Sequence, residues 1–482
     1  MFSVFRAFRF AVPLTLAALL AACAATPTAP PQLELPTQTT QAPAQPTWWT
    51  AFNDAKLTAL IEEALAHNLD LRAAVARIEE ARTQIVLAQQ DQFPNINLGV
   101  DALRSRSTEV GTNPLPPGFT AFSNDFRIGL NASYEVDFWS KYRSATQAAR
   151  NDLLATQFAR ETIRTTVAAD VARTYFNLLA TDAELALLRD TLQSRDESVA
   201  LQRDRFAAGV VGEFDLVTAE AERAAVAADI AGDERAIAEY ESALTVLLGR
   251  SPREVFEPTV AREDSVARLL DVPTIPSGLP SDLLARRPDV RQAESQLAAA
   301  SLRVDVARAD YFPSLSLTAG LGTESGALRH LFSGPAAIWS IGASLVQPLT
   351  ELRAIDANVE AARARREQVT VDYVKTVQTA FRETHDALVA NRSTRDALSA
   401  ESVRREKLQR ALELADIRYR SGYSPYLEVL DAQRQLLAAQ TLEIGAARNA
   451  RLAVIDLAKA LGGGWDYQAA LVSQNQEMGN RK

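Results

Sequence analysis

The sequence has very few of the residues on which most enzymes and metal proteins depend. Its 482 residues include one cysteine and three histidines. A single cysteine excludes a disulfide framework or a thiolate metal cluster within the chain. His67, His330 and His385 stand far apart, and none belongs to a His-Glu-x-x-His zinc motif. The sequence therefore predicts no metal site, no cofactor and no enzymatic activity.

Features that bind phosphate groups are equally scarce. No Gly-x-x-x-x-Gly-Lys-Ser/Thr loop occurs, so we do not expect ATP hydrolysis. The net charge of -9 argues against nucleic acid as a partner, because binding to a phosphate backbone needs a basic face. The apolar content of 47% is ample for buried cores and excludes wholesale disorder. Together these observations favour an architectural or transport protein.

The chain begins with a segment typical of an export signal. Arg6 and Arg9 precede an apolar run that ends at Leu20, and Ala21 and Ala22 then lead to Cys23. A basic start, a short apolar stretch and small residues describe a signal peptide, which is too short to span a membrane. We predict that this signal occupies residues 1–22 and is removed from the mature protein.

Leu-Ala-Ala-Cys resembles the bacterial lipobox, in which the cysteine sulfur receives diacylglycerol. We therefore predict a covalent lipid on Cys23, whose acyl chains would hold the protein to a membrane. Ala24, which follows, favours the outer membrane by its resemblance to lipoprotein sorting signals. The alternative is an ordinary signal peptide that contains a cysteine by chance. Residues 23–47 are rich in Pro, Thr, Gln and Ala and predict an extended tether.

The rest of the chain consists of two halves of similar design. Four short segments of the first half recur in the same order in the second, which indicates that a supersecondary unit was duplicated. The matches are Gln92–Leu98 with Tyr311–Leu317, Arg205–Gly209 with Arg418–Gly422, Gly232 with Gly445, and Leu248–Gly249 with Leu461–Gly462. The predicted domains are a first repeat at 48–250, an equatorial linker at 251–280, a second repeat at 281–465 and a flexible tail at 466–482.

Each half contains a long stretch without Gly or Pro, the residues that break helices. These stretches predict helices over 140–208 and 349–421, followed by shorter helices over 213–248 and 425–461. About seventy residues at 1.5 Å each would span roughly 100 Å. Apolar residues at spacings of three and four indicate coiled-coil-like packing. A long dimeric coiled coil is the alternative on this evidence alone.

Two further segments have the period of a strand rather than a helix. From Asp125 to Phe138, seven apolar residues alternate with seven others, which predicts a strand with one apolar and one polar face. Similar alternation predicts hairpins over 95–138 and 314–347, with strands long enough to cross a membrane at a tilt. Four strands cannot close a membrane barrel, whose minimum is about eight. Several chains must each contribute four strands if these hairpins span a membrane; a soluble sandwich sheet is the alternative.

At this point the sequence resembles the outer membrane factor family, the TolC-like channels, and within it the lipoprotein branch of the drug-efflux channels. The resemblance covers nearly the whole mature chain. It is carried by Trp48-Trp49 with Phe52 and Asp54, Tyr134–Trp139, Leu283–Val290, Tyr426–Arg434 and Ala460–Trp465.

The resemblance implies a mainly α fold with a membrane β-barrel portion, in which a homotrimer forms a 12-stranded barrel above a periplasmic tunnel of long coiled-coil helices. It implies a passive conduit that works with a periplasmic adaptor (membrane fusion) protein and an inner-membrane pump, usually of the resistance-nodulation-division class. The expected location is the outer membrane, in contact with its lipid, with the tunnel projecting into the periplasm.

The resemblance also places a gated aperture where paired helices turn. Gly209 and Gly422 stand at those turns and supply backbone freedom. The family's aperture residues match Asp431 as a carboxylate ring, Leu427 as an apolar constriction, Arg434 as a gating arginine and Glu428 in place of a second aspartate. Tyr419 and Asp215 match a pair that ties neighbouring coils in the shut state, whereas Ser424 stands where relatives have an arginine.

Three functions remain open from the sequence. The first is an efflux channel for small molecules, and the second is the outer membrane channel of a type I secretion system, because both share this scaffold. The third is a coiled-coil lipoprotein that tethers envelope layers without a pore. The strict alternation of residues 125–138 separates the channels from the tether, since a tether needs no strand with an apolar outer face.

Overall fold

The structure is a computed structural model that describes residues 47–108, 118, 120–257, 260, 262, 269–273 and 287–463. The predicted signal peptide, Cys23, the tether up to residue 46 and the tail at 466–482 lie outside the described residues, as does most of the linker at 251–280. The described chain is mainly helical and contains one sheet, as the sequence predicts.

The chain forms two compact units. One contains residues 79–155 and 293–373 and holds the whole sheet, and the other contains the described parts of 47–78, 156–292 and 374–463. Each unit draws segments from both halves of the sequence. The two repeats therefore follow one another along the chain, whereas each compact unit combines parts of both repeats.

The long helices lie where the absence of Gly and Pro predicts them, because nothing in those stretches interrupts the backbone hydrogen bonds. Their ends fall within a few residues of the predicted ones. The helices are α2 (Ala55–His67), α3 (Leu69–Gln90), α4 (Lys141–Ala207), α5 (Glu213–Leu247), α6 (Pro252–Phe256), α9 (Pro288–Ala309), α10 (Leu352–Arg420) and α11 (Tyr426–Ala460), with 3-10 turns η1 (Trp48–Phe52), η3 (Leu328–His330) and η4 (Gly334–Ala336).

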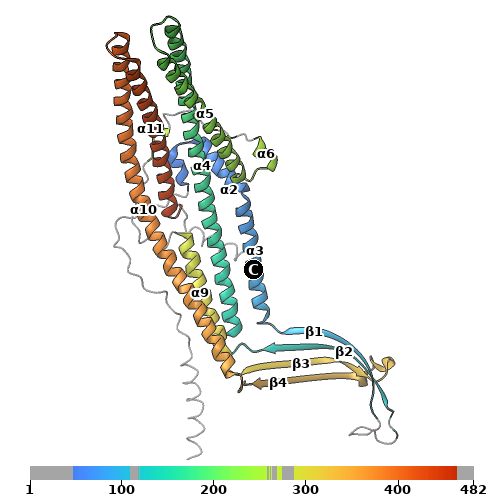
Figure 1. The fold of residues 1–482 in the computed structure, drawn as a ribbon. Coiled ribbons are helices and arrows are strands. Elements are labelled where there is room, and N and C mark those ends of the chain that lie inside the picture. The colour runs from blue at the N-terminus through green and yellow to red at the C-terminus, as the bar shows by residue number, and fades with distance from the viewer. Residues whose placement is uncertain are drawn as a thin grey trace, which may run out of the picture. The chain divides into compact units, whose positions relative to one another are not determined.

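Helices α4 and α5 form one helical hairpin, and α10 and α11 form a second (Figure 1). Gly209 ends α4 with a φ of 70°, a backbone conformation that side chains with a Cβ disfavour. The amides of Val210 and Gly209 donate to the carbonyls of Arg205 and Phe206, each at 2.9 Å. These two bonds satisfy the last carbonyls of the helix in a Schellman motif. Gly422 ends α10 with the same pair of bonds at a φ of 76°.

One antiparallel sheet contains β1 (Asn95–Arg106), β2 (Phe122–Glu135), β3 (Ser314–Ser325) and β4 (Ala337–Val346). The strands lie side by side in the order β1-β2-β3-β4 (Figure 1). The hairpin of the first repeat therefore joins the hairpin of the second through the pairing of β2 with β3.

The second compact unit has the largest buried core. Trp48, Trp49 and Phe52 of η1 pack against the middle of α4, where Tyr175 and Phe176 are fully buried. The Tyr175 hydroxyl donates a hydrogen bond of 2.8 Å to the buried carboxylate of Asp54. That carboxylate also caps α2, so one side chain ends a helix and satisfies a buried tyrosine.

Among the described helices, none is both long enough and apolar enough to cross a membrane.

Candidate functional site

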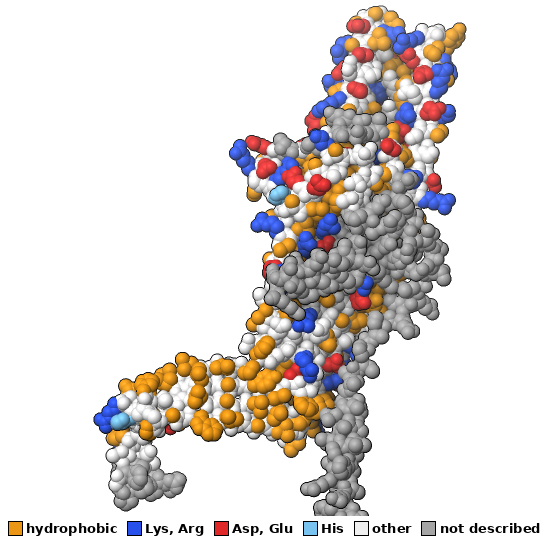
Figure 2. Space-filling view, turned by 180° about the vertical axis from the view of Figure 1, so that it is seen from behind, with side chains coloured by type: hydrophobic (Ala, Val, Ile, Leu, Met, Phe, Trp, Pro, Cys, Tyr) orange, Lys and Arg blue, Asp and Glu red, His pale blue; other side chains and the backbone are white. Residues whose placement is uncertain are grey.

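The sheet has one apolar face, which we call the band. On β1 the band consists of every second residue from Ile96 to Ala102. The register places each of these opposite an apolar residue of β2. It continues across β3 and β4, and Figure 2 shows apolar side chains spread over the sheet. Its members are Ile96, Leu98, Val100, Ala102, Phe126, Ile128, Leu130, Ala132, Tyr134, Leu315, Leu317, Ala319, Leu321, Ala337, Trp339, Ile341, Ala343 and Leu345.

Large side chains of the band are uncovered in the single chain. Leu98 is 68% exposed, Trp339 76% and Ile341 81%. Soluble monomers rarely expose a continuous apolar patch larger than a few hundred Å². The band therefore needs a cover, which is either lipid or protein.

Both edge strands of the sheet have a free side. In the described chain, β1 pairs with β2 alone and β4 pairs with β3 alone. Their outer edges thus present backbone N–H and C=O groups without partners. In lipid each such group costs several kcal/mol, and only closure of the sheet removes the edges. A membrane location of the band consequently requires further strands beyond these four.

The opposite face of the sheet is polar and carries small and charged side chains. Asp101, Arg127 and Glu324 form a row across β1, β2 and β3. The Arg127 Nε donates to the Glu324 Oε2 at 3.0 Å. A face of this kind is suited to line a water-filled passage.

Aromatic residues gather where the strands meet the helices. The rings of Trp139 and Phe312 are stacked with their centroids 4.3 Å apart, and the Trp139 Nε1 donates to the Pro313 carbonyl at 3.0 Å. Phe138 beside them is 60% exposed. Aromatic side chains at this position match the girdle that flanks the apolar belt of membrane barrels.

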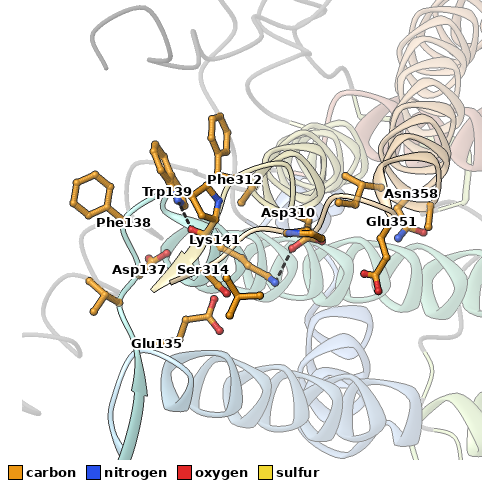
Figure 3. Close-up of a pocket in the computed structure, with 17 residues that line it drawn as sticks. Glu135, Asp137, Phe138, Trp139, Lys141, Asp310, Phe312, Ser314, Glu351 and Asn358 are labelled. Carbon is orange, nitrogen blue, oxygen red and sulfur yellow. Dashed lines mark hydrogen bonds and ion pairs between the residues drawn. The ribbon is translucent and has the colours of Figure 1, made fainter. Parts of the chain in front are cut away.

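A cavity of about 420 Å³ lies at this end of the sheet (Figure 3). Its wall mixes apolar groups with charges, and Lys141 pairs with Asp310 at 2.7 Å. Nearby, burial and then a hydrogen bond with Glu135 raise the pKa of Tyr142 to about 12. The cavity lies at the joint between the strands and the helices. The labelled lining residues are Glu135, Asp137, Phe138, Trp139, Lys141, Asp310, Phe312, Ser314, Glu351 and Asn358.

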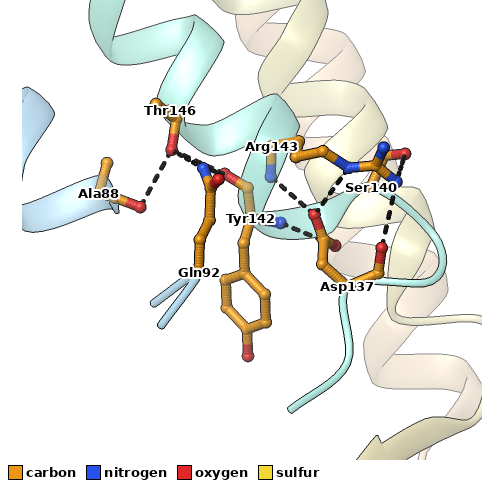
Figure 4. A network of polar contacts seen from close by, with 7 residues as sticks. All are labelled: Ala88, Gln92, Asp137, Ser140, Tyr142, Arg143 and Thr146. Atoms are coloured by element: carbon orange, nitrogen blue, oxygen red, sulfur yellow. Dashed lines mark hydrogen bonds and ion pairs between the residues drawn. The ribbon is translucent and has the colours of Figure 1, made fainter. Parts of the chain in front are cut away.

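A polar network explains why β2 ends at Glu135, three residues before the predicted end (Figure 4). The Asp137 carboxylate accepts hydrogen bonds from the amides of Tyr142 and Arg143, at 3.2 and 2.9 Å, and so caps α4. The Gln92 Nε2 donates to the Thr146 Oγ1 at 2.5 Å and joins the start of β1 to α4. The chain must leave the sheet to make this cap.

The start of α11 presents one exposed face. Leu427, Asp431 and Arg434 are spaced by four and three residues and are all exposed, whereas Val429 and Leu430 between them are buried. Residues at this spacing lie on the same side of a helix. The structure therefore brings together three of the residues that the resemblance places at the aperture, with Leu427 54% exposed.

Each charged residue of this segment has a partner. The Asp431 Oδ2 accepts from the Gln435 Nε2 at 2.6 Å. Glu428 pairs with Arg418 of α10 at 3.2 Å. Further along α11, Arg434 pairs with Glu222 of α5 and so links the two helices.

The predicted pair of Tyr419 and Asp215 is not joined within the described part of the chain. The Tyr419 hydroxyl accepts from Arg205 of α4, whose guanidinium lies 5.2 Å from the centre of the tyrosine ring. Asp215 lies in the first turn of α5, where the helix dipole favours an acid. The expected contact between neighbouring coils stays a prediction. The buried Ser424 hydroxyl has no hydrogen-bond partner among the described residues.

The sequence did not predict a polar seam between α4 and α11. It consists of Arg195 of α4 with Tyr426 and Gln433 of α11, and Gln202 lies two turns further along α4. Gln202 is fully buried, and neither polar atom of its amide has a partner among the described residues. Arg195 donates to Gln433, and burial lowers the pKa of its guanidinium. In the sequence these residues look like ordinary surface positions of a polar helix.

Other residues that carry the resemblance have structural roles. Arg287 is buried and binds Asp289 through two hydrogen bonds of 3.0 and 2.7 Å, and it also pairs with Glu383. Outside these segments, Arg451 is buried over the ring of Phe176, 4.8 Å from its centre. In the part of the chain that the structure describes, no group of side chains could hold a metal ion.

A sheet with an apolar face and two free edges, in a chain that also contains two long helical hairpins, is what a subunit of an outer membrane channel requires. Comparison with known proteins identifies the family. Residues 60–250 and 279–463 match the family model described as outer membrane efflux protein, and the chain belongs to that family.

Relatives with known names agree with this assignment. The cation efflux system protein CusC of Escherichia coli O6:H1 is 34% identical over 87% of this chain and 88% of its own length. The probable efflux pump outer membrane protein TtgC of Pseudomonas putida is 33% identical over 91% of this chain and 90% of its own length.

Solved structures show the same fold. The CmeC outer membrane channel of Campylobacter jejuni matches with a TM-score of 0.83 and 27% identity, over 92% of this chain and 97% of CmeC. The MtrE outer membrane channel of Neisseria gonorrhoeae, described in its open state, matches with a TM-score of 0.77 and 30% identity, over 91% of this chain and 98% of MtrE.

Proposed function

We propose that this protein is the outer membrane channel of a tripartite efflux system, a passive conduit without catalytic activity that carries small molecules out of the cell. The observation that carries the proposal is the exposed band on a sheet whose two edges are free. Three copies with four strands each would form a 12-stranded barrel, which exceeds the minimum of about eight. The band would face lipid and the polar face would line the passage.

The helical hairpins would continue the passage into the periplasm. In a trimer, the exposed face of α11 would place three copies of Leu427 and Asp431 around one axis. Like carboxylates in such a ring repel one another and attract cations, and apolar rings narrow the opening and disfavour water. This arrangement supports a gate at the periplasmic end.

The partners follow from the same architecture. A conduit without an energy source of its own needs a pump, and we propose an inner-membrane pump of the resistance-nodulation-division class with a periplasmic adaptor. The relatives are named for the efflux of cations, toluene and antibiotics, which supports small molecules rather than proteins as cargo. The polar face is generic, so we propose that the pump selects the cargo.

The lipid on Cys23 would add a second attachment to the outer membrane. Its support is the Leu-Ala-Ala-Cys sequence that follows the apolar run. Metabolic labelling with a radioactive or alkyne-bearing palmitate should mark the protein, and Cys23→Ser should remove the label.

Single-channel conductance in planar bilayers tests the proposed function. The wild-type protein should form a pore with a small resting conductance. Asp431→Ala and Leu427→Ala should each raise that conductance severalfold, because each removes a ring of side chains from the constriction. Lys407→Ala on α10 is the matched control, since Lys407 is exposed and lies outside the aperture segment. A protein that forms no pore refutes the proposal, and unchanged conductance in both variants removes these residues from the gate.

A further inference from the structure

Another cavity, of about 470 Å³, lies between helices α4, α10 and α11. All of its lining residues belong to the compact unit that has the largest buried core. Its volume falls within the range of about 300–1,000 Å³ that small-molecule sites have in proteins. The proposed function gives this cavity no role.

Gly445 leaves open space in the part of the cavity wall that α11 forms. It stands in the middle of a helix of 35 residues, where glycine is less favourable than any other residue except proline. A Cβ at this position would meet nothing within 4 Å beyond its chain neighbours and the backbone of its own helix. Leu442 and Ala446 of α11 and Ala397 of α10 give the same cavity an apolar surface. The cavity therefore has room for an apolar group against α11.

Two side chains of opposite charge line the cavity without joining each other. Glu184 of α4 and Arg448 of α11 are both half-buried, and neither forms an ion pair within the described part of the chain. The Arg448 guanidinium donates to the side chain of its neighbour Asn449, at a distance of 3.3 Å. The two charges are near enough to affect each other, because Arg448 opposes the rise in the pKa of Glu184. A carboxylate and a guanidinium placed in this way can bind a molecule that carries both an ammonium and a carboxylate group.

The other charges around the cavity favour an ammonium group beside Glu184. Burial, and then the negative charges of Asp233 and Asp229 of α5, raise the pKa of Glu184. One carboxylate oxygen of Asp233 is buried and has no hydrogen-bond partner among the described residues. Glu401 of α10, in contrast, pairs with Arg404 of its own helix at 3.4 Å. Uncompensated negative charge thus gathers between α4 and α5, and a bound cationic group would relieve it.

We propose that this cavity binds a small zwitterion, namely an amino acid or a related molecule with neighbouring ammonium and carboxylate groups and an apolar side chain. Glu184 would accept hydrogen bonds from the ammonium group, and Arg448 would donate two parallel bonds to the carboxylate. The apolar side chain would lie against Leu442. A ligand with a single charge would satisfy only one of the two protein side chains and would leave the other without a partner.

Equilibrium dialysis of the full, detergent-purified protein tests this inference with three matched probes. L-phenylalanine carries both charges, phenylalanine amide carries the ammonium group alone, and N-acetylphenylalanine carries the carboxylate alone. We expect L-phenylalanine to bind at least tenfold more tightly than either derivative, because the loss of one hydrogen bond between charged groups lowers affinity about tenfold or more.

Two charge variants should have opposite effects on the singly charged probes. Glu184→Gln should weaken the binding of L-phenylalanine and of the amide about tenfold, and it should not weaken the binding of the N-acetyl derivative. Arg448→Gln should weaken the binding of L-phenylalanine and of the N-acetyl derivative, and it should not weaken that of the amide. A purely structural defect would weaken the binding of all three probes alike.

A third variant fills the cavity. Gly445→Leu should abolish the binding of all three probes and should leave the protein folded, because leucine favours a helix more than glycine does. Gly232→Leu is the matched control. Gly232 is the counterpart of Gly445 in the first repeat, has open space at its Cβ position and lies outside the cavity wall. This control should bind L-phenylalanine as the wild type does, and thermal unfolding of both variants checks that they are folded.

Several outcomes would overturn the inference. Equal affinity for the three probes would remove the paired charges from the site, and unchanged binding in Gly445→Leu would place the ligand elsewhere. No binding of L-phenylalanine to the wild type also overturns it, as expected if another copy of the chain fills the cavity. The conductance of the same sample is measured in parallel. A conducting protein that does not bind L-phenylalanine refutes this inference alone, whereas a non-conducting protein refutes the proposed function.

Discussion

Ion pairs near the start of α11 join this helix to α5, which is far away in the sequence, and to α10, which precedes it. Arg434 contacts Glu222 of α5, and Glu428 contacts Arg418 of α10. Because Glu222 is mostly buried and Arg434 is half exposed, the first pair is a partly screened bond worth about 0.5–1 kcal/mol. Bonds of this strength can hold a gate shut and still break when the gate opens.

The pair of Arg434 and Glu222 should make the tip sensitive to acid. The hydrogen bond from Arg434, with its positive charge and that of Arg195, holds the pKa of Glu222 below its ordinary value of 4.5. A lowered pKa in the folded state contributes stability that is fully present above pH 4.5 and is lost as the pH falls through the lowered value. At pH 7, Glu222→Gln should therefore speed hydrogen exchange in residues 218–226 and 430–438 by about two- to fivefold, measured by mass spectrometry.

The same comparison at pH 3 should show a smaller difference between wild type and Glu222→Gln than at pH 7, because the carboxyl becomes protonated as the pH falls through its lowered pKa. The control is the same comparison made in the Arg434→Ala variant. There, the pH-dependent part of the effect of Glu222→Gln on the exchange rate should vanish. An effect of Glu222→Gln that is equally large at pH 3 and pH 7 would show that the pair does not act through charge.

Among the elements, the contact between α4 and α11 is unusual because it buries polar groups without satisfying them. Both polar atoms of the Gln202 amide and the Nε of Arg195 lack partners among the described residues. An unsatisfied buried group costs about 1–3 kcal/mol. These unsatisfied groups weaken the packing of α4 near the end where we propose the gate.

Gln202→Leu should therefore stabilise the protein by about 1 kcal/mol or more, because it replaces the amide with an apolar group of similar size. We expect a higher midpoint of thermal unfolding and a resting conductance no greater than that of wild type. Gln193→Leu is the control, since Gln193 is exposed on the same helix and its change should lie within 0.5 kcal/mol. A clear loss of stability in Gln202→Leu would show that the amide has a partner, such as an ordered water.

At the scale of helices and strands, the sequence predicts much of the structure. Alternation from Asp125 to Phe138 predicts β2, and the lack of Gly and Pro predicts α4 and α10, because both signals depend on the local chain. The end of β2 and the polar seam between α4 and α11 were not predicted. The first depends on Asp137, which caps the start of α4, and the second on Arg195, which meets Gln433 of α11. Helical period alone does not identify that neighbour.

The aperture residues illustrate the same limit. Helical spacing and exposure explain why Leu427, Asp431 and Arg434 share a face, and the resemblance supplies their role. Glu222 was not among the predicted residues, although it binds Arg434. In the sequence Glu222 is one of several acidic residues of α5. Only the structure, which pairs α5 with α11, shows that Glu222 meets Arg434.

For the whole molecule, the decisive feature is a surface that one chain cannot cover. The band exposes Leu98, Trp339 and Ile341 on one side of a sheet with two free edges. The polar face carries the charges of Asp101, Arg127 and Glu324 on the other side. The proposed closure by copies of the same chain would place both faces in suitable surroundings and leave no edge. A channel subunit is the function that this division of surface supports.

The most direct test of this account is the accessibility of spin labels placed one at a time along β4, from residue 338 to residue 345, in protein reconstituted into lipid. We predict that oxygen, which concentrates in lipid, relaxes the labels at Trp339, Ile341, Ala343 and Leu345, and that a water-soluble nickel reagent relaxes those at Ile338, Ser340, Gly342 and Ser344. Access of the nickel reagent to every position, or of neither reagent to the band, would contradict a closed barrel in the membrane.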